Sequence, residues 1–138
     1  MIRALSTTVG SKNTAQLFAL AMGLAYLLVG VVGFAVTRLD VVVGQNSDAT
    51  LLLFALNALH NLLHMTVGAI WIVASQVRAW ARSTNLLLGI AYALLTVLGF
   101  AGVLKVLAIG SMLDPDNFLH LATAMAAIYF GSAGADRS

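Results

Sequence analysis

Two short stretches place side chains capable of chemistry inside an otherwise apolar sequence. Residues 57–64 read NALHNLLH and residues 117–120 read NFLH, so the three histidines of the chain, His60, His64 and His120, each lie within three residues of an asparagine. Neutral imidazole binds transition metals and haem iron, and both imidazole and carboxamide groups form hydrogen bonds. These stretches therefore indicate either a ligand site or a set of buried hydrogen bonds.

The spacing of the first stretch places its polar residues on one side of a helix. Asn57, His60, Asn61 and His64 are separated as i, i+3, i+4 and i+7. Uncompensated polar groups are costly in hydrocarbon, so this face should point into a helix bundle or toward lipid headgroups. We favour helix capping and packing, with no cofactor. Two alternatives remain: a site for a small ligand, lipid or proton, and a haem or metal site using His64 and His120, with His60 as a third ligand.

The composition predicts the helices that must position these residues. The chain is 61% hydrophobic and 9% charged, and its mean hydropathy is +0.98. Four uncharged runs approach or exceed the roughly 20 residues that a helix needs to cross a bilayer, and they cover residues 13–37, 49–77, 83–104 and 117–135. We therefore predict an all-α fold, an integral membrane four-helix bundle in a single domain, 1–138. The expected transmembrane helices are about 14–36, 57–80, 84–106 and 116–134.

The second uncharged run is longer than one span requires. Residues 49–56 are therefore predicted to lie in the membrane interface as a short segment capped by Asp48 or Ser47. A helix continuous from Asp48 is the alternative. In the second half of the chain, Asp114, Pro115 and Asp116 form a strong helix start, with the acids as capping residues.

The chain also repeats itself. Residues 23–34 read GLAYLLVGVVGF and residues 89–100 read GIAYALLTVLGF, and each is followed by an Asn-x-Leu-His element. This order predicts two duplicated helical hairpins. The predicted polar cluster comprises Asn57, His60, Asn61, His64, Asn117, His120, Tyr26 and Tyr92, and the predicted helix-packing glycines are Gly23, Gly30, Gly33, Gly68, Gly89 and Gly99.

Several classes of function have no support in the sequence. Cysteine is absent, which excludes disulfides and thiolate chemistry. We see no glycine-rich phosphate loop and no nucleophile–base–acid set, so we predict that the protein is not an enzyme. The net charge of +2 is modest and gives no nucleic-acid-binding patch.

The charged residues predict an orientation in the membrane. On one predicted side lie Arg3, Lys12, Arg78, Arg82 and Arg137, with Trp80 as an aromatic anchor, and on the other lie Arg38, Lys105, Asp40, Asp48, Asp114 and Asp116. The excess of Lys and Arg on the first side predicts that both termini are cytoplasmic.

The stretch LLLFALNALHNLLHMTVGAIWIVAS, residues 51–75, resembles the signature of a family of bacterial membrane proteins, domain of unknown function 4383. The residues that carry the resemblance are Phe54, Asn57, His60, Asn61, His64 and Gly68, and further on Asp116, Asn117, Leu119 and His120. The resemblance implies a four-helix integral membrane protein and brings no established activity. Ala124 takes the place of the glycine at Gly68 in the last helix, so the two repeats need not share a ligand.

From these observations we predict a small multi-pass protein of the bacterial cytoplasmic membrane. Its expected role is that of an accessory or assembly subunit, whose partners are the lipid bilayer and other membrane subunits or further copies of itself. A haem- or metal-binding redox protein is the second hypothesis.

Overall fold

The computed structural model describes residues 11–37, 41–45 and 50–132. Within them the chain forms four α-helices: α1 (Thr14–Thr37), α2 (Ala58–Ala74), α3 (Arg78–Phe100) and α4 (Pro115–Gly131). An antiparallel pair of two-residue strands, β1 (Thr50–Leu51) and β2 (Phe54–Ala55), precedes α2, with Thr50 opposite Ala55. A short 3₁₀ helix, η1 (Lys105–Leu107), lies between α3 and α4. The predicted all-α class is confirmed.

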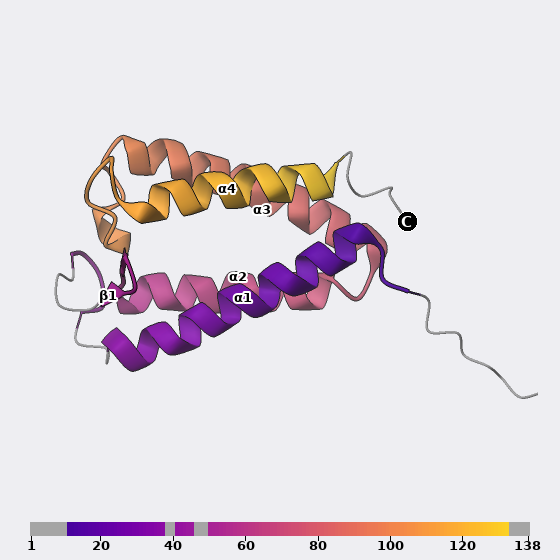
Figure 1. The fold of residues 1–138 in the computed structure, drawn as a ribbon, viewed down its shortest axis with the longest axis horizontal. Coiled ribbons are helices and arrows are strands. Elements are labelled where there is room, and N and C mark those ends of the chain that lie inside the picture. The colour runs from indigo at the N-terminus through magenta and orange to yellow at the C-terminus, as the bar shows by residue number, and fades with distance from the viewer. Residues whose placement is uncertain (1–10, 38–40, 46–49, 133–138) are drawn as a thin grey trace, which may run out of the picture.

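The helices form two antiparallel pairs that stack on each other (Figure 1). Helix α1 packs along α2 in one pair, and α3 packs along α4 in the other. The predicted glycines lie at these contacts: a Cβ on Gly23 would meet the Gly68 carbonyl oxygen at 2.8 Å, and one on Gly89 would meet Ile128 N at 2.8 Å. Glycine lets the two backbones approach this closely.

The same contact occurs once in each pair, near the end where the polar residues lie. A Cβ on Gly33 would collide with the side chain of Asn61, and a Cβ on Gly99 would collide with the side chain of Asn117. Both asparagines are fully buried. Each pair therefore has a matching glycine that makes room for a buried carboxamide.

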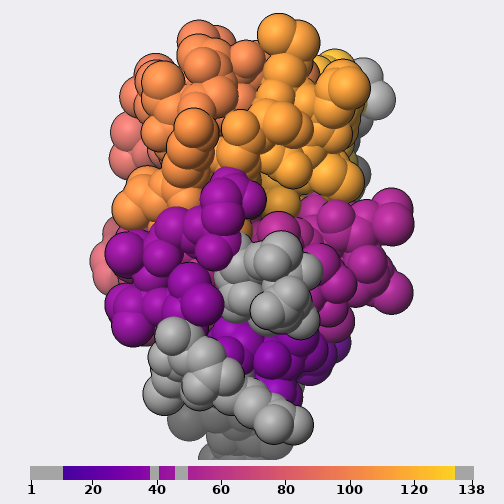
Figure 2. Space-filling model, turned by 90° about the vertical axis from the view of Figure 1, so that its left-hand side faces the viewer, coloured from indigo at the N-terminus to yellow at the C-terminus, as the bar shows by residue number. Residues whose placement is uncertain are grey.

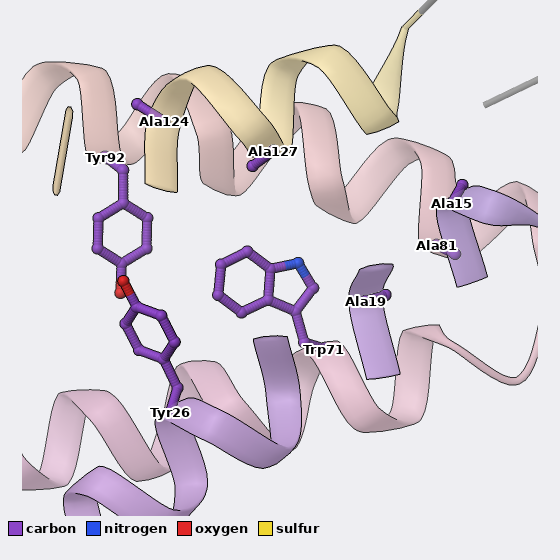
Figure 3. Packing of buried hydrophobic residues seen from close by; sticks show 8 residues of the cluster. All are labelled: Ala15, Ala19, Tyr26, Trp71, Ala81, Tyr92, Ala124 and Ala127. Atoms are coloured by element: carbon purple, nitrogen blue, oxygen red, sulfur yellow. The ribbon is translucent and has the colours of Figure 1, made fainter. Parts of the chain in front are cut away.

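Aromatic side chains fill the space between the two pairs. In Figure 3 the rings of Tyr26 and Tyr92 reach toward each other from α1 and α3, and the indole of Trp71 lies beside them. The ring centroids of Tyr26 and Tyr92 are 5.5 Å apart, and Trp71 stacks on Tyr92 at 6.1 Å with an interplanar angle of 4°. Small residues surround these rings: Ala15, Ala19, Ala81, Ala124 and Ala127. The gap visible between the ribbons in Figure 1 is thus packed with side chains.

One end of the bundle is closed by segments from both halves. Figure 2 looks directly at this end, where the purple segments that precede α2 lie against the orange connection between α3 and α4. Gly44 N donates to Val106 O at 3.1 Å. The Asn57 carboxamide donates to both Gly44 O and Val106 O, at 3.0 and 2.8 Å. Asn57 therefore ties the two connections together at the start of α2.

The segment before α2 differs from the prediction. Residues 49–56 were expected to form a capped interfacial segment or part of a helix continuous from Asp48, but residues 50–55 form the β1–β2 hairpin. Leu52 makes the turn with a φ of 57°. Helix α2 begins only at Ala58 because Asn57 is its N-cap, with its side-chain oxygen accepting from His60 N at 2.8 Å. The predicted caps Ser47 and Asp48 lie outside the described residues.

The junction between α2 and α3 was also predicted in the wrong place. The sequence suggested helices over 57–80 and 84–106, whereas α2 ends at Ala74 and α3 begins at Arg78. Lys12 Nζ and Gln16 Nε2 cap the end of α2 by donating to Ser75 O at 2.9 and 3.0 Å. Helix α3 ends at Phe100 because Gly102 takes a left-handed conformation, with φ of 71°. Arg78, expected at the end of the second helix, and Arg82, expected in the loop after it, both lie in the first turns of α3.

The other predicted helices lie close to their expected positions. Helix α1 covers Thr14–Thr37 against a predicted 14–36. Helix α4 starts at Pro115 and ends at Gly131, and the predicted end at 134 lies outside the described residues. Within the described part of the chain, two helices, α1 and α3, are by length and composition apolar enough to cross a membrane.

Candidate functional site

The predicted polar residues gather at one end of the bundle, between the two helical pairs. His60, Asn61 and His64 are buried on α2, and Asn117 and His120 are buried on α4. The ring centroids of His60 and His64 are 4.4 Å apart, and those of His60 and His120 are 6.3 Å apart. The three histidines thus form one cluster that joins α2 to α4.

The two predicted tyrosines form one wall of this cluster. Tyr26 on α1 makes an edge contact with His64 at 5.1 Å, and Tyr92 on α3 contacts His120 at 5.3 Å. The Tyr26 hydroxyl shares a hydrogen bond of 2.8 Å with the Thr123 hydroxyl of α4. All four helices therefore contribute to the cluster.

The two predicted asparagines, in contrast, serve local structure. Asn61 Nδ2 donates to the Thr37 hydroxyl at 3.2 Å. Asn117 Nδ2 donates to Ser111 O and Met112 O at 2.9 and 3.1 Å, and so holds the connection that enters α4. These contacts agree with the capping and packing interpretation for the asparagines.

Asp116 also belongs to the histidine cluster, although the sequence did not predict it there. Asp116 was predicted to act with Asp114 as a helix cap, but it is 3% exposed, and its Oδ1 lies 3.8 Å from His60 Nε2. Asp114 occupies the N-cap position without capping the helix, because its carboxylate accepts from Gly110 N and Ser111 N at 2.6 and 2.5 Å. The predicted helix start is confirmed, since Asp114 is the N-cap residue, Pro115 follows it and Asp116 lies in the first turn, but neither carboxylate forms a side-chain cap hydrogen bond to α4.

One signal in the sequence could have found Asp116. Asp116 precedes Asn117 as His60 precedes Asn61, so aligning the two Asn-x-Leu-His elements puts the acid at the position of the histidine. Both side chains then point into the space between the pairs, where they face each other.

A second polar contact between the pairs was also missed. Trp71 Nε1 donates to Asn85 Oδ1 at 3.0 Å, and Asn85 Nδ2 donates to Ala15 O at 3.0 Å. Trp71 and Asn85 are fully buried. Asn85 precedes Gly89 and Tyr92 by four and seven residues, so its position on the predicted inner face of that helix was a usable signal.

Several polar atoms of the histidine cluster have no hydrogen-bond partner among the described residues. They are both ring nitrogens of His60, both ring nitrogens of His64, and Nδ1 of His120. The three histidines are at most 4% exposed. Buried polar atoms normally form hydrogen bonds, so these nitrogens need a hydrogen-bonding side chain, a water or a ligand.

The closest group of potential metal ligands among the described residues differs from the predicted pair of His64 and His120, which stays a prediction. The residues whose ligand atoms all lie within 4.8 Å of one another are His60, Asp116 and His120. His64 lies one helical turn from His60 and contacts it through its ring. Position 60, which the sequence suggested only as an added ligand, is thus central.

These features define an all-α four-helix protein with a buried polar cluster between two helical pairs. The chain belongs to the family described as domain of unknown function (DUF4383), whose profile matches residues 16–133. The resemblance inferred from the sequence is confirmed. No curated protein and no solved structure shows significant similarity to the chain.

Proposed function

We propose that this chain is a small, non-enzymatic integral membrane protein of four transmembrane helices that acts as an accessory or assembly subunit. The observation that carries the proposal is the distribution of side chains on the helices. Large apolar residues point outward, such as Leu28, Val97 and Met125, which are 64%, 65% and 65% exposed. Glycine, alanine, asparagine and histidine are buried instead. Lipid is the solvent that suits such a surface.

The two shorter helices fit the same proposal. Helices α2 and α4 have 17 residues each, which corresponds to about 25 Å at about 1.5 Å per residue. This length is at the lower limit for crossing a bilayer. Both helices also present large apolar residues outward, including Ile70 and Val73 on α2 and Leu121 on α4. Lys12, Arg78 and Arg82 lie at the end where α1 and α3 begin, which supports the proposal that this end is cytoplasmic.

The proposal includes an internal duplication of one helical hairpin. Its support is that residues at matching positions make matching contacts. Gly33 meets Asn61 as Gly99 meets Asn117, and Tyr26 contacts His64 as Tyr92 contacts His120.

A groove between α2 and α3 supports the role as a subunit that binds partner helices. It has a volume of about 460 Å³ and an almost wholly apolar lining that includes Ala69, Ile70 and Ala74. Small residues let a neighbouring helix approach closely, which is how membrane helices associate in lipid. A transmembrane helix of another subunit, or of a second copy of this chain, would fill this groove.

Single-cysteine variants in native membranes test the proposal, since the natural chain has no cysteine. We expect Ser111→Cys, in the exposed connection before α4, to react with a membrane-impermeant maleimide in intact cells. Ala79→Cys, at the start of α3, should react only after permeabilisation. The protein should also stay with the membrane after alkaline carbonate extraction. Release by carbonate, or labelling of both sites from outside, would contradict a four-span protein with cytoplasmic termini.

The same membranes test the accessory role. Ala69→Cys in the groove should form cross-linked species with a lipid-soluble cross-linker, and mass spectrometry should identify a membrane-protein peptide in the product. Leu87→Cys is the control, because Leu87 is exposed on α3 and does not line the groove. Equal cross-linking of both variants, or none at Ala69→Cys, would argue against a partner in this groove.

A further inference from the structure

We propose that His60, Asp116 and His120 together bind one divalent transition-metal ion between the two helical pairs. Each residue offers one ligand atom, and these atoms all lie within 4.8 Å of one another. Ligand atoms around a tetrahedral ion, at bond lengths of about 2.1 Å, lie about 3.4 Å apart. His60 Nε2 and Asp116 Oδ1 are already 3.8 Å apart. Small side-chain rotations therefore bring the three atoms to bonding distance of a common ion.

Most ring nitrogen atoms of the proposed ligands lack hydrogen-bond partners in the described part of the chain. Both ring nitrogens of His60 and Nδ1 of His120 have no hydrogen-bond partner among the described residues, although each histidine is only 2% exposed. The cost of burying such atoms unpaired is about 1–3 kcal/mol for each group. A metal ion would satisfy one nitrogen of each ring, as it does in known imidazole sites.

The Asp116 carboxylate is buried and needs a positive charge beside it. Asp116 is 3% exposed, and the partner of its one ion-pair contact in the described part of the chain is His60. Among the described cations, Lys12, Arg78 and Arg82 lie at the opposite end of the bundle, and Lys105 is exposed. A buried carboxylate is unfavourable unless its charge is balanced. A divalent ion bound to the same atom would balance it.

The ligand types select the class of metal. Two imidazoles and one carboxylate suit Zn²⁺ or Fe²⁺, whereas Ca²⁺ and Mg²⁺ prefer sets made only of oxygen. Beside the cluster lies a cavity of about 90 Å³ lined in part by His64, Asp116 and Leu52. It has room for a few waters at about 30 Å³ each, so a water or small ligand can take the fourth position. A porphyrin would need a far larger space.

The position of the three ligands gives the ion a structural consequence. His60 lies on α2, whereas Asp116 and His120 lie on α4. An ion bound to all three would join the two helical pairs at the end closed by the β1–β2 hairpin. Metal binding should therefore stabilise the folded bundle, because a ligand that binds only the folded state raises its stability.

The test uses the full chain in detergent micelles, stripped with a chelator and titrated with Zn²⁺ alone, and with Co²⁺ as a coloured probe. We expect one ion per chain, visible Co²⁺ absorption bands and a rise in the thermal midpoint on addition of Zn²⁺. The variants His60→Gln, Asp116→Asn and His120→Gln should each weaken Zn²⁺ binding at least tenfold and lose the rise in midpoint.

The variant His64→Gln is the matched control. His64 has the same side chain on the same helix and is also buried, yet it is outside the three-residue set. It should bind Zn²⁺ within a few-fold of the unaltered chain. Loss of binding in this variant equal to that in His60→Gln would overturn the proposed ligand set.

Helical circular dichroism and elution volume check that each variant is folded. For a variant that fails this check, the unaltered protein decides: histidine nitrogen NMR signals of two residues, not three, should shift on Zn²⁺ addition. Failure of the unaltered chain to bind Zn²⁺ or Co²⁺ would overturn the proposal, and so would a Soret band in the purified protein. None of these results depends on membrane orientation or on partner subunits.

Discussion

The two hairpins of this protein share one internal contact between residues of the same types, and they meet each other through both like and unlike residues. Within each hairpin a glycine faces a buried asparagine, Gly33 with Asn61 and Gly99 with Asn117. Between the hairpins, Tyr26 contacts the aligned Tyr92, and other contacts join residues that differ at aligned positions. The histidine at position 60 corresponds to Asp116, and the two lie opposite each other.

Trp71 and Asn85 are a second pair of unlike residues that meet between the hairpins. Trp71 corresponds to Ala127 in the second hairpin, and Asn85, to which it donates a hydrogen bond, corresponds to Ala19 in the first. The large and polar residue of one hairpin thus meets a complementary residue of the other, while the alanines leave room. Like residues therefore build each hairpin in the same way, whereas the hairpins join through the like pair Tyr26–Tyr92 and through unlike pairs such as Trp71 with Asn85.

Among the contacts between the hairpins, we expect the loss of the Trp71 side chain to reduce stability most. We expect Trp71→Ala to lower the free energy of unfolding by about 3–5 kcal/mol, because it opens a cavity among packed rings and leaves Asn85 Oδ1 without its donor. Thermal and denaturant unfolding in detergent would measure this. The control is Trp80→Ala, since Trp80 is 59% exposed. A similar loss in both variants would show that Trp71 does not join the hairpins.

The glycine–asparagine contacts test the similarity of the hairpins. Gly33→Ala and Gly99→Ala should each cost about 1–3 kcal/mol, because the added Cβ collides with the asparagine side chain. Gly99→Ala should cost more, since displacing Asn117 breaks two hydrogen bonds to backbone carbonyls, whereas Asn61 donates to one hydroxyl. Unfolding free energies of the two variants provide the comparison. A larger loss for Gly33→Ala would contradict this order.

We expect the smallest change in stability at Thr123, where the two hairpins differ by one hydroxyl group. Thr123 corresponds to Val67, and its hydroxyl bonds Tyr26 across the bundle. Thr123→Val should cost about 0.6 kcal/mol, the average for hydrogen bonds between membrane helices. Thr66→Val is the control because the exposed Thr66 hydroxyl bonds Leu62 O of its own helix. A double-mutant cycle with Tyr26→Phe should recover a coupling of this size, and zero coupling would remove the hydroxyl pair from the interface.

Much of the fold could be predicted because helical periodicity is local. The apolar runs indicated the helices, and the spacing of Gly23, Tyr26, Gly30 and Gly33 indicated the inner face of α1, all four of which are buried. Predicted helix ends were less accurate where distant residues determine them. Helix α2 ends at Ala74, where Lys12 and Gln16 donate hydrogen bonds to the carbonyl oxygen of Ser75. No local sequence pattern predicts such contacts.

The sequence by itself determined which side chains must face inward, because polar groups and glycines recurring at helical spacing in an apolar chain share one face. The tertiary structure alone decided which of them meet. It placed His60 opposite Asp116 and within reach of His120, and it brought Trp71 to Asn85. The physical reason is that contacts between hairpins depend on how far one pair is shifted and rotated against the other. That relation arises from the packing of all the inner residues together, not from any one stretch of the chain.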